Sequence, residues 1–319
     1  MNPAIRVAVP SISFCQSETL RRELLDFYPD SRFNEGPERL DPEELVEFLS
    51  DRDAAIIGLE RLTEPMLRLL PDLRVISRMG VGVDNVDPEL LNRFGIRIGW
   101  TGGTNRHSVA ELAISFAIAG LRHIAPLNFE MRSRNRPGAL MGRQLRNRTV
   151  GVHGCGNVGR EVIKLLAPFA CRVLACDVRD MTEFYDQHGV EAVSMNELVE
   201  RSEVLSLHLP LNDSTSNLYS SDVLIRLRPD CVLINTCRGG IIDEAALENC
   251  LRTGRIAAAC FDVFAVEPPT DDALINAPNF LCTPHIGGSS VEARLAMGRA
   301  AITGLTDTVV PERGIPPFD

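Results

Sequence analysis

The sequence has 319 residues, of which 45% are hydrophobic and 24% are charged, which is the composition of an ordinary soluble globular protein. A chain of this length exceeds what a single small core organises, so two domains are expected. The formal net charge of −10 argues against a nucleic-acid-binding face, although a local group of arginines still permits an anionic small substrate.

Cysteine usage and the N-terminus bear on the compartment. Nine cysteines are present, and none of them forms a C-x-x-C pair. Their odd number, and apolar surroundings such as "CVLI" and "AAACFDVF", favour buried reduced thiols, so we expect neither disulfides nor a metal site. The N-terminal "MNPAIRVAVPSISF" lacks the basic region and cleavage site of a signal peptide. No apolar stretch approaches the roughly 18 residues that span a membrane, and a cytoplasmic protein is expected.

Apolar runs typical of strands alternate with helix-period segments along the whole chain. The first series of expected strands comprises residues 5–11, 54–59, 74–82 and 95–100, with helices over 18–28 and 41–51. The second series comprises residues 149–154, 172–177, 204–210, 231–236, 256–264 and 279–285. Strands that are nearly all apolar and separated by helices indicate parallel sheets covered on both faces. Two such series predict two doubly wound α/β domains.

The break between the two series falls within residues 100–124, "WTGGTNRHSVAELAISFAIAGLRHI". A glycine pair precedes a long helix there, which Ser108 is expected to begin and Arg122 and His123 to close. The tail over residues 291–310 is also helical, and because it lies beyond the second series it is expected to return to the first domain. The expected domains are residues 1–101 with 290–319, and residues 102–289.

A glycine-rich turn in the second series indicates a dinucleotide site. Gly154-x-Gly156-x-x-Gly159 follows an expected strand and opens a helix, and Asp177 ends the next strand, 18 positions after Gly159. Gly154 permits the tight turn, Gly156 lets a pyrophosphate approach the helix N-terminus, and Gly159 allows close helix–strand packing. Asp177 would accept hydrogen bonds from ribose hydroxyls and repel a 2′-phosphate. NAD is therefore favoured over NADP, although the nearby Arg179 weakens that preference.

Polar residues also follow three later apolar strands, at the edge where open α/β sheets bind ligands. "VLINTCRGGIID" carries Arg238, "CFDVFAVEPP" carries Asp262 and Glu267, and "NFLCTPHIGG" carries His285. Each stretch is ambiguous on its own, because an arginine beside glycines is often a loop residue and a glutamate before two prolines often lies in a solvated turn.

Together these stretches resemble the D-isomer-specific 2-hydroxyacid dehydrogenases over essentially the whole chain. The motifs that carry the resemblance are "GCGNVG", "HLPLNDST", "INTCRGGIIDEAAL", "FDVFAVEP" and "TPHIGG". The resemblance implies a Rossmann dinucleotide-binding domain inserted in a flavodoxin-like substrate-binding domain, with NAD as cofactor. It implies an oxidoreductase that moves a hydride between NAD(H) and a D-2-hydroxy acid or 2-keto acid. It further implies a homodimer formed through the dinucleotide-binding domains. The net charge and the lack of a long apolar stretch predict neither nucleic acid nor a membrane as partner.

The resemblance assigns catalysis to Arg238, Glu267 and His285. An imidazole exchanges a proton near neutral pH, and a carboxylate on its other nitrogen fixes the ring and favours the imidazolium. An arginine holds the substrate carboxylate and polarises the keto oxygen. For the cofactor, the resemblance adds these residues to the glycine turn and Asp177: Asn157, Val158, His208, Pro210, Thr236, Cys237, Asp262 and Gly287.

The run "ISRMGVGVDNVD" resembles the substrate loop of phosphoglycerate dehydrogenases. This implies that the backbone N–H groups of Val81 and Gly82 contact the substrate carboxylate, and that Arg78 meets a substrate phosphate. A surface arginine at a strand end is an equally good interpretation of Arg78. The next loop, "WTGGTN", departs from the "NTPNGN"-like run of that group, since Trp100 replaces a small polar residue. With the sequence ending at Asp319, an additional C-terminal regulatory domain is not expected.

Three functions remain as hypotheses. The first is NAD-dependent interconversion of 3-phosphoglycerate and 3-phosphohydroxypyruvate, or of a related anionic acid. The second is a 2-keto acid reductase of the glyoxylate/hydroxypyruvate type, with an altered cofactor choice. The third is a non-enzymatic, NAD-sensing interaction protein of the C-terminal-binding-protein type, which the lack of a disordered tail or recognition extension disfavours.

Overall fold

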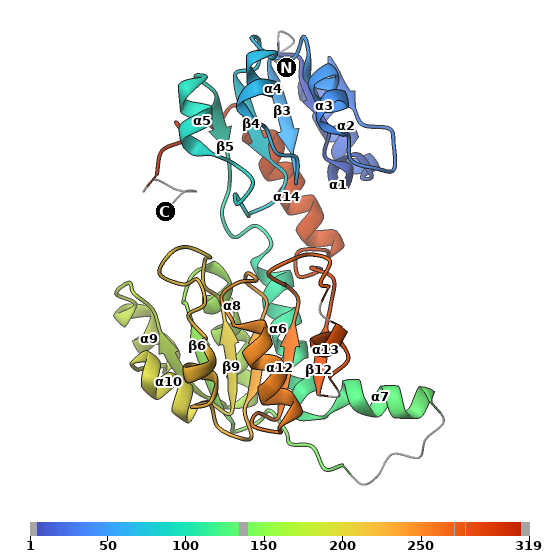
Figure 1. Ribbon diagram of the computed structural model, residues 1–319. Helices are drawn as coiled ribbons and strands as arrows, with labels where there is room; N and C mark the ends of the chain where they lie inside the picture. Colours follow the sequence, from blue (N-terminus) through green and yellow to red (C-terminus); the bar gives the residue numbers. More distant parts are fainter. Residues whose placement is uncertain (1–4, 134–139, 271, 278, 314–319) are drawn as a thin grey trace. The chain divides into compact units, whose positions relative to one another are not determined.

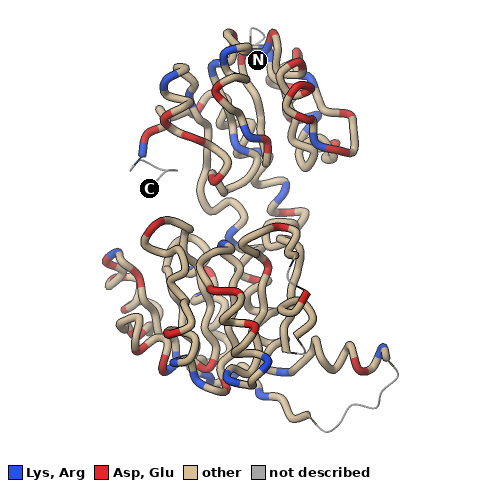
Figure 2. Tube along the Cα trace, viewed as in Figure 1, with Lys and Arg blue, Asp and Glu red and all other residues tan. Residues whose placement is uncertain are grey.

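The computed structural model describes residues 5–133, 140–270, 272–277 and 279–313. Contacts divide the chain into two units, Met1–Asn105 with Ser289–Asp319, and Arg106–Gly288 (Figure 1). Each unit is a parallel sheet with helices on both faces, which confirms the predicted fold class. Basic and acidic residues are interspersed along the chain in both units (Figure 2).

The first unit has a five-stranded sheet in the order β2-β1-β3-β4-β5, with every pair parallel. This is the flavodoxin-like order, in which the strand order reverses between β1 and β3. Its strands are β1 (Val7–Val9), β2 (Ser31–Phe33), β3 (Ala54–Ile57), β4 (Val75–Arg78) and β5 (Arg97–Gly99). Its helices are α1 (Ile12–Cys15), α2 (Glu18–Phe27), α3 (Pro42–Leu49), α4 (Glu64–Arg68), α5 (Pro88–Arg93) and α14 (Val291–Thr303).

Alternate strand residues of this sheet face opposite layers, because successive side chains in a strand point to opposite faces. Val7 and Val9 pack in a cluster with residues of α2 and α14, whereas Ala8 packs with residues of α3, α4 and α5. Helix α14 comes from the far end of the chain. Its end approaches β5 so closely that a Cβ on Gly99 would overlap the backbone of Gly304.

The second unit has a seven-stranded parallel sheet in the order β12-β11-β10-β9-β6-β7-β8. Its strands are β6 (Thr149–His153), β7 (Arg172–Cys176), β8 (Glu191–Ala192), β9 (Val204–Leu207), β10 (Val232–Asn235), β11 (Ala258–Phe261) and β12 (Phe280–Cys282). Its helices are α6 (Arg106–Leu121), α7 (Ile124–Arg132), α8 (Asn157–Leu166), a 3₁₀ turn (Ala167–Phe169), α9 (Thr182–His188), α10 (Met195–Arg201), α11 (Ser221–Leu224), α12 (Glu244–Arg252) and α13 (Asp272–Ile275). The strand order reverses between β6 and β9, the position where doubly wound sheets bind ligands.

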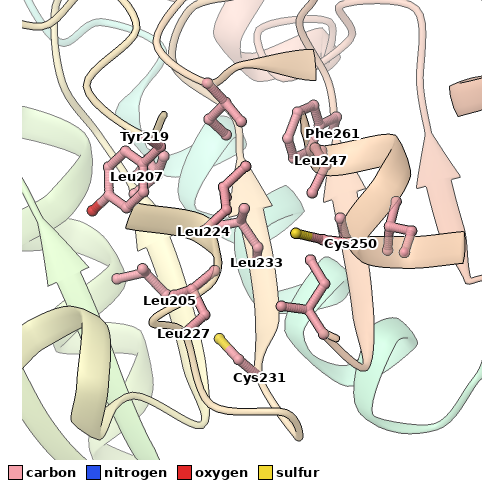
Figure 3. Close-up of a cluster of buried hydrophobic side chains, with 14 of the residues drawn as sticks. Leu205, Leu207, Tyr219, Leu224, Leu227, Cys231, Leu233, Leu247, Cys250 and Phe261 are labelled. Carbon is pink, nitrogen blue, oxygen red and sulfur yellow. The ribbon is translucent and has the colours of Figure 1, made fainter. Parts of the chain in front are cut away.

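The two faces of this sheet bury separate clusters. Leu205, Leu233 and Phe261 pack with residues of α10, α11 and α12 on one face (Figure 3). The neighbouring strand residues Val204 and Val232 pack with residues of α6 and α8 on the other face. All-apolar strands such as "VLIN" therefore follow from burial on both sides.

Some elements differ from the expectation. The long helix begins at Arg106 rather than Ser108, and the tail helix ends at Thr303, where Gly304 caps it, rather than at residue 310. The short strands β2 and β8 were not expected. In the described part of the chain no single helix is long and apolar enough to cross a membrane, although α6 and α7, bent by 67°, together match the required length and composition.

Candidate active site

Three neighbouring strands of the second unit end at one edge of the sheet and carry the predicted catalytic residues. Arg238 follows β10, Glu267 follows β11 and His285 follows β12, and these strands pair in that order. The loop after Arg238 lies against the loop before Glu267, because a Cβ on Gly239 would overlap the backbone of Phe264. Parallel strands thus gather residues that are up to 47 positions apart in sequence.

His285 and Glu267 form a hydrogen-bonded pair. His285 Nδ1 lies 2.8 Å from Glu267 Oε2, and Glu267 Oε1 accepts a hydrogen bond from the Phe264 N–H at 3.1 Å. The two side chains remain 51% and 37% exposed, so the pair is open to an external ligand. His285 Nε2 has no hydrogen-bond partner among the residues that the structure describes. A carboxylate on Nδ1 fixes the ring orientation and leaves Nε2 to exchange a proton.

Asp262 holds the loop on which His285 is carried. The residue is 1% exposed, and its carboxylate accepts hydrogen bonds from Thr283 Oγ1 at 2.5 Å, Ile286 N at 2.7 Å and Gly287 N at 2.7 Å. The backbone of His285 has a φ of 55°, a left-handed conformation that non-glycine residues adopt at a cost. The three hydrogen bonds of Asp262 stabilise this conformation, and such strain is typical of functional sites.

Ser108 also contacts this loop, which sequence reasoning missed. The Ser108 hydroxyl donates to the Gly287 carbonyl at 2.6 Å, so the expected helix-capping residue instead links α6 to the histidine loop. The two residues are 179 positions apart, and no local pattern signals such a contact.

Arg238 lies in a loop that the side chain of Asn235 organises. Asn235 Nδ2 donates to the Arg238 carbonyl at 2.9 Å, and Asn235 Oδ1 accepts from the Cys237 N–H at 3.1 Å. Arg238 Nη1 in turn donates to the Cys237 carbonyl at 2.7 Å, and the residue is half-buried. Burial raises the pKa of the Cys237 thiol, which makes a nucleophilic role for this cysteine unfavourable.

The predicted glycine turn has the shape of a phosphate cradle. Gly154 has a φ of 91°, and a Cβ there would overlap the His208 carbonyl, while a Cβ on Gly159 would overlap Gly154. Gly156 lies at the N-terminus of the ten-residue helix α8, which no side chain caps, and a Cβ there would meet only the Arg179 side chain, at 3.6 Å. Backbone N–H groups at this helix end, around Asn157 and Val158, suit an anion such as a pyrophosphate.

Asp177 ends β7 beside this turn and already receives several donors. Its carboxylate accepts from the Cys155 N–H at 2.5 Å, and the backbone and guanidinium of Arg179 donate to it at 2.8 to 3.2 Å. Burial alone raises the pKa of Asp177, but the hydrogen bonds from Arg179 and Cys155 outweigh it and the net pKa is lowered. The Arg179 side chain is 62% exposed, so ribose hydroxyls can replace it on Asp177 at small cost.

Two buried polar atoms on neighbouring strand ends fit a bound dinucleotide. His208 Nδ1 and Thr236 Oγ1 are inaccessible to solvent and have no hydrogen-bond partner among the described residues. His208 Nε2 lies 2.9 Å from the Ser206 hydroxyl, and burial lowers the pKa of His208 to about 3, so its imidazole is neutral. Unpaired buried polar atoms cost free energy, and a ligand that pairs them recovers it. The residues present therefore fit NAD.

His153, directly before the glycine turn, has a structural partner. Its Nδ1 lies 2.7 Å from the hydroxyl of Tyr219, which is fully buried. Burial lowers the pKa of His153 to about 4, so it is neutral at physiological pH. This pair supports the end of β6 beneath the turn.

In the first unit, the predicted substrate loop follows β4. The carbonyls of Val81, Gly82 and Val83 accept hydrogen bonds from Trp100 Nε1 at 2.8 Å, Arg78 Nη2 at 2.6 Å and Val86 N at 2.9 Å. The N–H groups of Val81 and Gly82 donate to no other described residue. These two half-buried amides are therefore available to an anionic ligand.

The side chain of Arg78 is buried and donates to backbone carbonyls of its own unit. The residue is 4% exposed, its Nη1 and Nη2 donate to the Gly58 and Gly82 carbonyls, and its buried Nε lacks a partner among the described residues. Burial lowers its pKa to about 10, so it stays charged. Its interpretation as a surface arginine was wrong, and its role toward a substrate phosphate stays a prediction that these contacts do not favour.

Comparison with known proteins assigns the family. The protein-family model described as "D-isomer specific 2-hydroxyacid dehydrogenase, NAD binding domain" matches residues 114–287. The chain is 34% identical over 284 residues to a hydroxypyruvate reductase of Thermotoga maritima, covering 87% of this chain and 90% of that protein. It is 32% identical over 265 residues to a D-3-phosphoglycerate dehydrogenase of Mycobacterium leprae, covering 82% of this chain but only 50% of that protein. A solved glyoxylate reductase from Paecilomyes thermophila has a TM-score of 0.81 and 26% identity, with 95% and 94% of the two chains covered. The chain therefore belongs to the D-isomer-specific 2-hydroxyacid dehydrogenase family and is an oxidoreductase that uses NAD.

Proposed function

We propose that this enzyme interconverts a short, unphosphorylated 2-keto acid and the corresponding D-2-hydroxy acid. The observation that carries this proposal is the half-exposed His285–Glu267 pair, held at 2.8 Å beside the Arg238 loop. NAD, when bound, supplies or accepts the hydride. His285 Nε2 donates the proton to the keto oxygen during reduction and removes it during oxidation.

Arg238 and Glu267 support this proton transfer. The Arg238 guanidinium binds the substrate carboxylate and polarises the keto oxygen, since its fork of donors matches a carboxylate. Glu267 compensates the positive charge that His285 carries when it is protonated. In the first unit, the amides of Val81 and Gly82 are two further donors that suit a substrate carboxylate.

The choice of an unphosphorylated substrate depends on Arg78. An arginine that binds a phosphate directs its terminal nitrogens toward it, whereas those of Arg78 donate to the Gly58 and Gly82 carbonyls. Moving it would leave the Gly82 carbonyl unpaired, at a cost of about 1–3 kcal/mol, and would leave the Gly58 carbonyl with only the hydrogen bond from Asn85 Nδ2 at 3.3 Å. The relationship to a hydroxypyruvate reductase over 90% of that protein supports the same choice. 3-Phosphohydroxypyruvate remains the second candidate, supported by the relationship to phosphoglycerate dehydrogenases.

The cofactor assignment extends to the remaining predicted residues. We propose that Asn157 and Val158 donate backbone N–H groups to the pyrophosphate, and that His208 and Thr236 pair their unsatisfied atoms with the dinucleotide. Pro210, Cys237 and Gly287 would contact it through backbone or apolar atoms. Asp262 is proposed to act mainly through the loop it holds, because its carboxylate already accepts three hydrogen bonds.

A panel of 2-keto acids tests this function. Oxidation of NADH and of NADPH is followed with glyoxylate, hydroxypyruvate, pyruvate and 3-phosphohydroxypyruvate, with His285→Gln as the inactive control. We expect the largest kcat/KM with NADH and an unphosphorylated acid. A preference for 3-phosphohydroxypyruvate would contradict the substrate assignment. Turnover of none of these acids would contradict the enzymatic proposal and favour an NAD-sensing role.

We further propose a homodimer formed through the second unit. Helix α7 extends away from the body of that unit (Figure 1), and none of its nine residues, all of which are described, is buried. Phe129 is 72% exposed, Met131 is 65% exposed and Ile124 is 50% exposed, which a second copy would cover. Light scattering should give the mass of a dimer for the wild type and of a monomer for Phe129→Asp. A wild-type monomer would contradict the proposal.

The cytoplasm is the proposed location. All nine cysteines are free, and five of them are buried, as expected for a protein kept in a reducing compartment.

A further inference from the structure

We propose that Trp100 is a positioning residue that orients the N–H of Gly82 toward the substrate carboxylate. Trp100 directly follows β5, and its indole Nε1 donates to the Val81 carbonyl at 2.8 Å, across 19 positions of sequence. The inference rests on the proposed function, because it assumes that Val81 and Gly82 bind the substrate.

The peptide group between Val81 and Gly82 carries this argument. The Val81 carbonyl and the Gly82 N–H belong to one planar trans peptide unit, in which the two bonds point in opposite directions. A donor that fixes the direction of the carbonyl therefore fixes the direction of the N–H. Trp100 holds the carbonyl on one side of this unit, and the Gly82 N–H, which donates to no other described residue, points to the other side.

This restraint matters because the loop is otherwise free to rotate its peptide units. Gly80 has a φ of 134°, which other residues rarely adopt, and Gly82 offers similar freedom. Arg78 restrains the next unit by donating to the Gly82 carbonyl at 2.6 Å. Two side chains at the ends of neighbouring strands thus hold consecutive peptide units of the loop: Arg78 is the last residue of β4, and Trp100 directly follows β5.

The indole ring is itself held in place by its own loop. Trp100 is half-buried, and a Cβ on Gly102 would come within 2.6 Å of the ring atom Cη2, so the ring lies directly against Gly102. A real side chain at position 102 would displace the ring and with it the Nε1 donor. Gly102→Ala should therefore reproduce the loss of the hydrogen bond without changing the tryptophan.

The experiment compares Trp100→Phe and Gly102→Ala with the wild type and with Gly36→Ala. The control adds a methyl group in another loop of the same unit, where it meets only Asn34 Oδ1, at 3.2 Å. Steady-state kinetics are measured with NADH and the keto acid of the panel that has the highest kcat/KM. Phenylalanine keeps a ring but has no N–H donor. For both test variants we expect the KM for the keto acid to rise by about threefold to tenfold, the factor that one neutral hydrogen bond contributes.

The two KM values and the melting temperature distinguish a positioning role of Trp100 from a general loss of structure. The KM for NADH should stay within about twofold of the wild-type value, and the melting temperature of Trp100→Phe should match that of Gly36→Ala. If the wild type reduces keto acids but Trp100→Phe keeps its KM for the keto acid, or raises both KM values equally, the positioning role of Trp100 is refuted and the proposed function stands. If the wild type reduces no acid of the panel, the proposed function and this inference both fail.

Discussion

Replacing Asp262 by asparagine tests how strongly catalysis depends on the loop that carries His285. The carboxylate accepts three hydrogen bonds, and the residue is 1% exposed. An asparagine keeps one acceptor oxygen, and it directs its amide N–H₂ at a group that is itself a donor. At least one hydrogen bond to a charged acceptor is lost, which contributes about 1.5–3 kcal/mol. The left-handed backbone of His285, with φ of 55°, then has less to offset its cost of about 1–2 kcal/mol.

If the lost hydrogen-bond free energy no longer holds His285 in its catalytic orientation, kcat should fall by about 10-fold to 150-fold, since 1.36 kcal/mol is about tenfold in rate. The assay is keto acid reduction with NADH, with melting temperature measured in parallel. Thr283→Val is the matched control, because it removes one of the three donors and leaves the carboxylate. Its decrease in kcat should therefore be smaller. A variant with wild-type kcat and a raised KM for NADH would refute the loop-positioning argument. It would indicate instead that Asp262 acts by direct contact with the cofactor.

Three further predictions concern the proton donor, the cofactor preference and acid stability. His285→Gln should lower kcat by about 10²-fold to 10⁴-fold, the range of general acid–base catalysis, while NADH binding measured by fluorescence titration stays unchanged. Asp177→Ala should raise the ratio of kcat/KM for NADPH to kcat/KM for NADH by about tenfold or more. The substitution removes the carboxylate that repels a 2′-phosphate and leaves the Arg179 guanidinium in place. An unchanged ratio would mean that Asp177 does not select the cofactor. Burial lowers the pKa of His153 to about 4 and of His208 to about 3, so below about pH 6.5 the unfolded chain binds more protons than the folded one. The free energy of unfolding should have its full value above that pH and should be lower by about 2 kcal/mol per histidine at pH 5. Urea denaturation at pH 5 and at a pH above 6.5 measures this difference. Equal urea midpoints at the two pH values would show that these histidines are not buried as neutral groups.

The fold, and the gathering of the proposed catalytic residues at one edge of a sheet, could be predicted from the sequence for a physical reason. Strands buried on both faces are apolar throughout, as in "VLIN" of β10, and parallel strands all end at one edge, so a polar residue after each strand belongs to one site. Strands β2 and β8 lack this signal because none of their residues is buried. Short exposed edge strands need no apolar run, and the sequence therefore gives no indication of them.

Long-range contacts explain the other differences between the sequence-based predictions and the structure. Ser108 has the residue type of a helix cap, but its partner is the Gly287 carbonyl, 179 positions away. Arg78 follows the family pattern of a basic residue, but whether it faces a ligand or the backbone depends on where the Gly58 and Gly82 carbonyls lie. Neither partner is implied by local spacing, so these two roles required the structure.

A common property distinguishes the groups that are proposed to act on a ligand from those that hold the site. Asp262 and Arg78 are charged and almost fully buried, and their polar atoms are largely occupied by neighbouring loops. His285 keeps Nε2 without a partner among the described residues, and the same holds for the N–H groups of Val81 and Gly82. An available atom binds an external molecule without first breaking a contact, whereas Asp177 must release the Arg179 guanidinium to accept ribose hydroxyls. On the first unit the available atoms belong to the main chain, and any residue type supplies them. The substrate is therefore the part of the function that side-chain motifs specify least, and Trp100, which aims one of those amides, is the position at which to test it.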